Sequence, residues 1–243
     1  MRDRTAAIIV IGNEILSGKV ADTNAAFLAR ELRAVGVSLR RILVIPDEVE
    51  TIAAAVRDYQ PAFDVVFTSG GVGPTHDDVT IAGIAGGLGC GVVRNPVLER
   101  KIREWSGGVS TEARLKMAEV PEGAELVYAG DSDFPTVTIR NIFILPGIPE
   151  IFRAKIEALK SRLAVDPYFL RVVYLRALES TLAPYLNATL EAFPELLLGS
   201  YPTLNDPEYR VRVTLESKDQ AYVERALSHL LAQLQSDIVV RTE

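Results

Sequence analysis

The residue types best suited to chemistry are concentrated in one glycine-rich segment, residues 69–80, which reads SGGVGPTHDDVT. Gly70, Gly71 and Gly73 allow the backbone to turn sharply and to approach a ligand closely. An apolar run precedes the segment and a helical pattern follows it, so free N–H groups of the helix start are expected to face the same place. The segment is neither a Walker A loop nor GxGxxG. We predict a loop that binds phosphate, with the backbone N–H groups of residues 70–73 as donors.

Two adjacent carboxylates, Asp77 and Asp78, distinguish this segment from an ordinary turn. The alternative interpretation is a tight strand-to-helix turn in which Thr75 or Asp77 caps the helix. One cap requires only one carboxylate, and two adjacent carboxylates repel each other. The second carboxylate is then available to a divalent cation that also binds phosphate oxygens. The sequence therefore favours a metal-assisted phosphate site over a plain turn.

Further polar residues follow two other apolar runs, in residues 12–18 (GNEILSG) and 46–48 (PDE). In an open parallel sheet, ligands bind beyond the carboxyl ends of the strands, so Glu14, Asp47 and Asp78 are expected at one edge. Alternatives stay open, since Asp47 also suits the cap of the next helix and Glu14 suits a solvated turn. Residues 146–150 (PGIPE) join a later strand to a helix, and either close the pocket or form a plain turn.

The elements that must position these residues alternate along the chain. Apolar, β-branched runs predict buried strands, and apolar positions spaced by three or four residues predict helices. The predicted strands are 6–11, 39–45, 63–68, 137–139 and 141–145, and the helices begin near residues 24, 52, 81, 96, 111 and 149. Strand and helix alternating over short connections indicates an α/β fold with a mostly parallel sheet and right-handed crossovers.

A boundary is expected at Asp166-Pro167, which divides the chain into domains 1–166 and 167–243. Beyond it the pattern changes to strand, helix, strand, strand, helix and strand. These elements are predicted at residues 169–178, 180–193, 196–201, 209–215, 221–234 and 238–240. This βαββαβ order predicts a small α+β domain of the ferredoxin-like type.

Composition excludes several classes of protein. The chain of 243 residues has a net charge of −6, which argues against a general nucleic-acid binder. One cysteine and two histidines are too few for a structural zinc site. No apolar run approaches the length of a membrane span, so no membrane partner is expected. The N-terminal apolar run ends at once in a polar turn, unlike a signal peptide, and the default expectation is a cytoplasmic location.

Several of these motifs together resemble one known family. They are residues 11–18 (IGNEILSG), 22–24 (DTN), 46–47 (PD), 69–80, 95–96 (NP), 145–150 (LPGIPE) and 199–202 (GSYP). The chain resembles the molybdopterin-binding-like family of the MoaB/MogA type, in its CinA-like branch. It is also similar to the N-terminal region of eukaryotic FAD synthases. Residues 134–137 (FPTV) and 199–202 favour the FAD-synthase type.

The resemblance implies a three-layer αβα domain that forms dimers or trimers, and a site at the sheet edge. Asp47 and Asp78 match the two aspartates that serve adenylylation chemistry in MogA-like members. We expect them to be catalytic, and a divalent metal (Mg, Mn or Co) to be held by Asp47, Asp77 and Asp78. The expected substrate or phosphate contacts are Gly12, Glu14, Asn24, Ser69, Gly70, Gly71, Gly73, Pro74, Thr75, Thr80, Pro146 and Gly147.

Three alternative functions are compared, of which the resemblance implies the first two. CinA-like members suggest metal-dependent hydrolysis of ADP-ribose, and the FAD-synthase type suggests FAD pyrophosphatase activity, each of which releases AMP. The second alternative is molybdopterin binding or adenylylation in molybdenum cofactor biosynthesis. The third is a non-catalytic nucleotide-binding module. Asn13 stands where CinA-like chains usually carry aspartate, which puts a metal-ligand role at this position in question.

Overall fold

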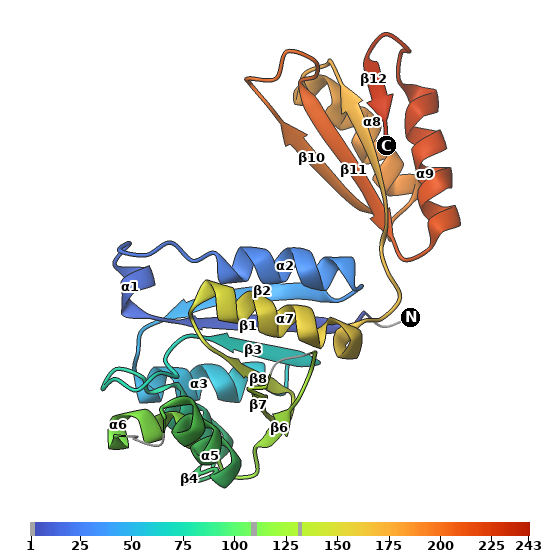
Figure 1. Cartoon of the computed structure of the whole chain (residues 1–243). Helices are drawn as coiled ribbons and strands as arrows, with labels where there is room; N and C mark the ends of the chain where they lie inside the picture. Colours follow the sequence, from blue (N-terminus) through green and yellow to red (C-terminus); the bar gives the residue numbers. More distant parts are fainter. Residues whose placement is uncertain (1–2, 108–110, 131–132) are drawn as a thin grey trace. The chain divides into compact units, whose positions relative to one another are not determined.

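The chain divides into two compact units, Met1–Val165 and Asp166–Glu243. A computed structural model describes residues 3–107, 111–130 and 133–243, and each unit is treated by itself below (Figure 1). No helix within these described ranges is long and apolar enough to cross a membrane.

The first unit contains a mixed sheet of six strands in the order β2-β1-β3-β8-β7-β6. Its strands are β1 (Thr5–Ile11), β2 (Ser38–Ile45), β3 (Val65–Ser69), β6 (Glu125–Val127), β7 (Thr136–Ile139) and β8 (Ile142–Leu145). The pairs β2-β1, β1-β3 and β3-β8 are parallel, whereas β7 and β6 are antiparallel additions. Four consecutive parallel strands therefore end at the same edge, as the sequence predicted.

Helices cover both faces of this sheet, which confirms the three-layer αβα fold. The long helices are α2 (Asn24–Ala34), α3 (Val49–Tyr59), α4 (Thr80–Leu88) and α7 (Pro149–Leu163). Alternate residues of β1 point to opposite faces. Ile8 packs with α2 and α7 in one core cluster, and Ile9 packs with α3 and α4 in another. The β1 strand is buried on both faces, and this explains its continuous apolar sequence.

The contact between α3 and α4 depends on a helical glycine. A Cβ atom on Gly83 would lie 2.5 Å from the Cβ of Ile52, whereas one on Gly86 would meet Ala53 at an ordinary 3.7 Å. We expect Gly83→Ala to lower the free energy of unfolding by about 1–3 kcal/mol through overpacking. Gly86→Ala is expected to raise it by about 0.5–1 kcal/mol, because alanine favours the helix. Urea unfolding checks both, and equal effects of the two changes would contradict this packing.

A smaller cluster of elements packs beside α4. It contains β4 (Val92–Arg94), α5 (Pro96–Trp105), α6 (Glu112–Leu115), the 3-10 helix η1 (Lys116–Ala118) and β5 (Glu119–Pro121). Leu98, Ile102, Leu115, Ala118 and Val120 form its buried core. The helices were predicted from sequence. The strands β4, β5 and β6 were not, because three residues carry too little periodic pattern.

The second unit has the predicted βαββαβ order. Its elements are β9 (Phe169–Leu175), α8 (Glu179–Ala192), β10 (Leu197–Pro202), β11 (Val211–Ser217), α9 (Gln220–Gln233) and β12 (Val239–Thr242). The sheet order is β10-β11-β9-β12, and every neighbouring pair is antiparallel. This is the ferredoxin-like topology.

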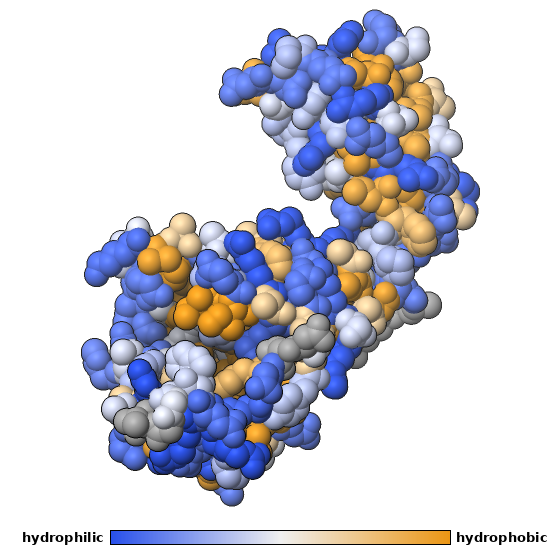
Figure 2. Space-filling view, viewed as in Figure 1, coloured by the Kyte–Doolittle hydropathy of each residue, from blue (hydrophilic) through white to orange (hydrophobic). Residues whose placement is uncertain are grey.

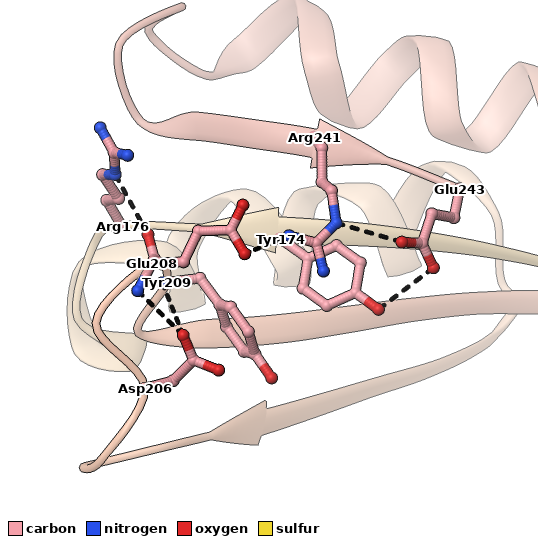
Figure 3. A network of polar contacts seen from close by, with 7 residues as sticks. All are labelled: Tyr174, Arg176, Asp206, Glu208, Tyr209, Arg241 and Glu243. Carbon is pink, nitrogen blue, oxygen red and sulfur yellow. Dashed lines mark hydrogen bonds and ion pairs between the residues drawn. The ribbon is translucent and has the colours of Figure 1, made fainter.

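A polar network ties the loop before β11 and the end of β12 to β9 (Figure 3). The Arg241 guanidinium lies 3.8 Å from the centroid of the Tyr174 ring and pairs with Glu208 and Glu243. The Tyr174 hydroxyl donates to the Glu243 carboxylate at 3.2 Å, and the ring of Tyr209 packs edge-on against Tyr174. These residues are engaged with one another, and we assign them a structural role.

Candidate functional site

Backbone hydrogen bonds hold together the loops that follow the four parallel strands. The N–H of Gly12, just after β1, donates to Ile45 O at the end of β2 at 3.1 Å. The N–H of Gly70, just after β3, donates to Leu145 O at the end of β8 at 3.2 Å. The ladder thus extends past the strand ends and fixes the bases of these loops. Gly70 N–H is occupied in this way, so the prediction that it serves as a phosphate donor is wrong.

Asn24 joins three of these loops. Its side chain is nearly buried, and its Nδ2 donates to Ser69 Oγ at 3.0 Å and to Gly147 O at 2.9 Å. The carbonyl of Gly147 only accepts hydrogen bonds, and this fixes the orientation of the amide. Within the described ranges, the buried Oδ1 atom of Asn24 has no hydrogen-bond partner. The structure therefore brings together the predicted residues Asn24, Ser69 and Gly147.

The first turn of the glycine-rich loop requires glycine. Gly70 has φ 105° and Gly71 has φ 64°. A Cβ atom on Gly70 would lie 2.2 Å from Ile11 O, and one on Gly71 would lie 2.3 Å from the Thr80 hydroxyl. Thr80 is buried; its hydroxyl donates to Gly70 O at 2.9 Å and its N–H donates to Gly71 O at 3.0 Å. The start of α4 is thereby fastened to the turn after β3.

Asp78 organises the second half of the loop. Its Oδ2 atom accepts from Thr75 N at 2.8 Å and from Thr75 Oγ1 at 2.5 Å. The carboxylate lies against Gly73, where a Cβ atom would be 2.6 Å from Asp78 Oδ2. The helix α4 begins at Thr80, and Val79 occupies its N-cap position without a side-chain bond. The alternative in which Thr75 or Asp77 caps this helix is therefore wrong.

Asp77 is the exposed neighbour of the half-buried Asp78. The pKa of the Asp77 carboxyl lies below its ordinary value, because the neighbouring Thr75 side chain, the backbone N–H of Asp77, His76 and Lys116 all favour its charged form. A hydrogen bond to a carboxylate favours its charged form. Asp77 therefore presents a negative charge on the surface of the loop at neutral pH.

Asp47 and Glu14 belong to the loops after β2 and β1. Asp47 Oδ2 accepts from the backbone N–H of Asn13 at 2.7 Å, while Glu48 occupies the N-cap position of α3. The alternative of Asp47 as a helix cap is therefore wrong. Glu14 lies in the short helix α1 (Asn13–Leu16), not in a turn, and its carboxylate covers Gly12. Asn13 takes part through its backbone N–H group.

Asp47 and Asp78 are engaged by different partners, Asp47 by Asn13 N and Asp78 by Thr75. The described residues include no group of three or more His, Cys, Asp or Glu side chains placed to hold a metal ion. The predicted set of Asp47, Asp77 and Asp78 therefore does not form a metal site from protein atoms alone. Magnesium is commonly bound by one or two carboxylates together with substrate phosphates. The residues present fit a metal that arrives with a phosphorylated ligand, and the metal itself stays a prediction.

Pro74 and Pro146 lie in the two loops around this centre. Pro74 is exposed in the glycine-rich loop, and Pro146 is half-buried directly after β8. Gly147 packs beside Gly70, since a Cβ atom on Gly147 would lie 3.3 Å from the Gly70 Cα. The loop after β8 therefore lies against the glycine-rich loop.

One residue of the site was not predicted from sequence. The Nζ atom of Lys116 donates to Thr75 O at 2.5 Å, across a separation of 41 residues. Lys116 comes from η1, directly after α6, which lies at the same end of the unit as the loop after β3 (Figure 1). No motif surrounds Lys116, so the sequence offers no signal for this contact.

The first unit is an open α/β sheet whose four parallel strands end at one edge, in loops that are hydrogen-bonded to one another. Domains of this class bind ligands at that edge of the sheet. The chain belongs to the molybdopterin-binding domain family, because residues 7–164 match the family described as a probable molybdopterin binding domain. Residues 167–243 match the middle domain of FAD synthase.

Individual proteins support this assignment. The chain is 35% identical to a protein of Archaeoglobus fulgidus, over 90% of this chain and 93% of that one. It is 31% identical to a probable FAD synthase of Caenorhabditis elegans, over 97% of this chain and 51% of that protein. It therefore spans about half the length of that relative. A solved structure of the protein CinA of unknown function from Thermoplasma acidophilum is 32% identical with a TM-score of 0.61, covering 66% of this chain and 98% of that one.

Proposed function

We propose that this protein is a metal-dependent nucleotide pyrophosphatase that cleaves ADP-ribose or FAD and releases AMP. The observation that carries the proposal is the glycine-rich loop after β3, where Asp78 is bonded to Thr75 and Asp77 stays charged. The loop combines close backbone approach with carboxylates at the carboxyl edge of a parallel sheet. The similarity of both units to FAD-synthase sequences supports a flavin or adenine nucleotide as the ligand.

The chain's own residues have distinct roles in this proposal. Backbone N–H groups of residues 71–73 bind the phosphate oxygens and stabilise charge that develops on them. Asp78 and Asp47 place negative charge at the edge, with Asp77 assisting. Together with the substrate phosphates, Asp47, Asp77 and Asp78 would hold a divalent ion, which would supply positive charge to polarise the pyrophosphate and activate water. Asn24 holds the start of α2 against the end of β3 and the loop after β8, since it donates hydrogen bonds to Ser69 and Gly147.

The proposal predicts release of AMP that depends on a divalent metal. Purified protein is incubated separately with ADP-ribose and with FAD, in Mg²⁺, Mn²⁺, Co²⁺ or EDTA, and the products are separated by chromatography. We expect AMP from at least one substrate in at least one metal, and none in EDTA. The absence of AMP from both substrates in all three metals would sink the proposal for these substrates.

A second candidate function is molybdopterin binding or adenylylation, supported by the description of the family that matches residues 7–164. The same loop would then bind the phosphate of the pterin. Fluorescence of oxidised pterin released from the purified protein tests this candidate. Retained pterin without any diphosphate hydrolysis would favour it over the pyrophosphatase.

We also propose that the protein is a homo-oligomer, a dimer or a trimer. Large apolar residues are exposed after β1 and after β8, at Leu16, Val20, Ile148 and Ile151. Figure 2 shows hydrophobic surface among hydrophilic side chains on the viewed face of the first unit. Exposed apolar surface of this kind commonly marks an interface. Light scattering coupled to gel filtration measures the mass, and a monomer at all concentrations would contradict the proposal.

A further inference from the structure

Lys116 places a positive charge against the glycine-rich loop. Its Nζ atom donates to Thr75 O at 2.5 Å, and this carbonyl belongs to the residue whose N–H and hydroxyl bind Asp78. An ammonium group has three N–H donors. Among the residues that the structure describes, Thr75 O is the only hydrogen-bond acceptor found on this ammonium group. Two donors are therefore available to a ligand on the loop.

The position of Lys116 is set by a packed support. Its neighbours Leu115 and Ala118 are buried in the cluster that also contains Leu98 and Ile102. The carbonyl of Ala118 accepts from Asn95 N at 2.8 Å, which fastens the end of η1 to the start of α5. The side chain of Lys116 is half-buried, so part of its stem packs on protein while the ammonium reaches the loop. The charge is thus held in place before a ligand binds.

The electrostatics of the loop explain why such a charge is needed. Asp77 and Asp78 are adjacent carboxyl groups on the loop, and a phosphorylated ligand brings further negative charge to the same place. Like charges at short range repel, most strongly where water is partly excluded. The influence of Lys116 already extends to Asp77, whose pKa it lowers. A fixed cation beside the loop offsets this repulsion, and a lysine ammonium suits phosphate as a point charge.

We propose that Lys116 is a specificity-determining residue of the site, whose ammonium donates hydrogen bonds to a phosphate oxygen of the ligand while it stays bonded to Thr75 O. The inference rests on the proposed function, since it requires a phosphorylated ligand at this loop. In this role, Lys116 makes the protein bind a nucleotide more tightly than the corresponding uncharged nucleoside.

Binding of AMP and of adenosine, measured by calorimetry in Mg²⁺ buffer, tests this role. Lys116→Met keeps the length of the side chain and removes its charge. We expect the affinity for AMP to fall roughly 10- to 100-fold, because a hydrogen bond to a charged group is lost. The affinity for adenosine and the melting temperature are expected to change little. Lys116→Arg is expected to restore most of the AMP affinity.

A matched control removes the same charge from the same unit. Lys101 in α5 pairs with Asp133 and lies over the ring of Tyr128, so Lys101→Met leaves the loop contacts intact. We expect AMP affinity within about twofold of the wild type, since the contacts given for Lys101 are with Asp133 and Tyr128 and not with the glycine-rich loop. Loss of AMP affinity as large as that of Lys116→Met would overturn the inference, because a general charge effect would then explain both.

The remaining outcomes separate this inference from the function on which it rests. If the wild-type protein binds neither AMP nor ADP-ribose nor FAD, the proposed function fails, and the inference fails with it. If the wild type binds AMP and Lys116→Met binds it equally well, only the role of Lys116 is wrong. If Lys116→Met loses AMP and adenosine equally and melts at a lower temperature, Lys116 is a structural clamp of the loop and not a phosphate contact.

Discussion

Asp78→Asn is expected to reduce AMP release from ADP-ribose or FAD by at least about 100-fold in kcat. Asparagine keeps the size of the side chain and one oxygen that accepts from Thr75, so the loop is expected to keep its shape. The change removes the negative charge that is needed beside the phosphates and the metal. Initial rates of AMP release at saturating substrate measure the effect, and circular dichroism verifies the fold.

Asp58→Asn provides the matched control. Asp58 is exposed in the last turn of α3, which starts at the carboxyl edge of the sheet and runs back towards the other edge. The Asp58→Asn protein loses the same charge as Asp78→Asn, and we expect it to release AMP at the wild-type rate. An Asp78→Asn protein with wild-type turnover of every diphosphate tested would show that the reaction does not use this carboxylate.

Gly70→Ala is expected to have the largest effect on folding in the first unit. The new Cβ atom would lie 2.2 Å from Ile11 O, and the residue would have to adopt φ 105°. Ile11 is the buried last residue of β1 and cannot move without breaking the sheet. Overpacking and backbone strain each cost about 1–3 kcal/mol, so we expect a loss of roughly 2–6 kcal/mol. This is a large fraction of the total stability of a domain.

Differential scanning calorimetry measures this change as a drop of roughly 5–20 °C in the melting temperature. Gly89→Ala separates strain from the clash, because Gly89 has φ 70° at the end of α4 and a Cβ atom there would meet nothing within 4 Å. We expect it to cost about 1–2 kcal/mol. Equal losses at the two positions would mean that backbone conformation alone requires glycine, and that the close approach to Ile11 O does not matter.

Only part of the site could be predicted, because some of its contacts join neighbouring residues and others join residues that are far apart in the chain. The chemistry of residues 69–80 is local, so the glycines, Asp77, Asp78 and the following helix were recognisable together. The roles of Asp47 and Asn24 were less accessible, since each depends on a partner from another loop. Asp47 bonds to Asn13 N across 34 residues, and Asn24 bonds to Gly147 O across 123. No pattern along the chain distinguishes such a contact from an ordinary helix cap.

The sequence by itself determined the α/β class of the first unit, the βαββαβ order of the second and the sheet edge that carries the glycine-rich loop. Periodicity and turn residues are properties of neighbouring positions, and the carboxyl edge follows once strands are parallel. Tertiary structure alone decided that Gly70 N–H belongs to the sheet ladder, that Asp47 accepts from Asn13 N, and that Lys116 contacts the loop. The physical reason is that these three contacts depend on which atoms folding brings within hydrogen-bond distance. The number of residues between two positions does not predict whether their atoms meet in the folded chain.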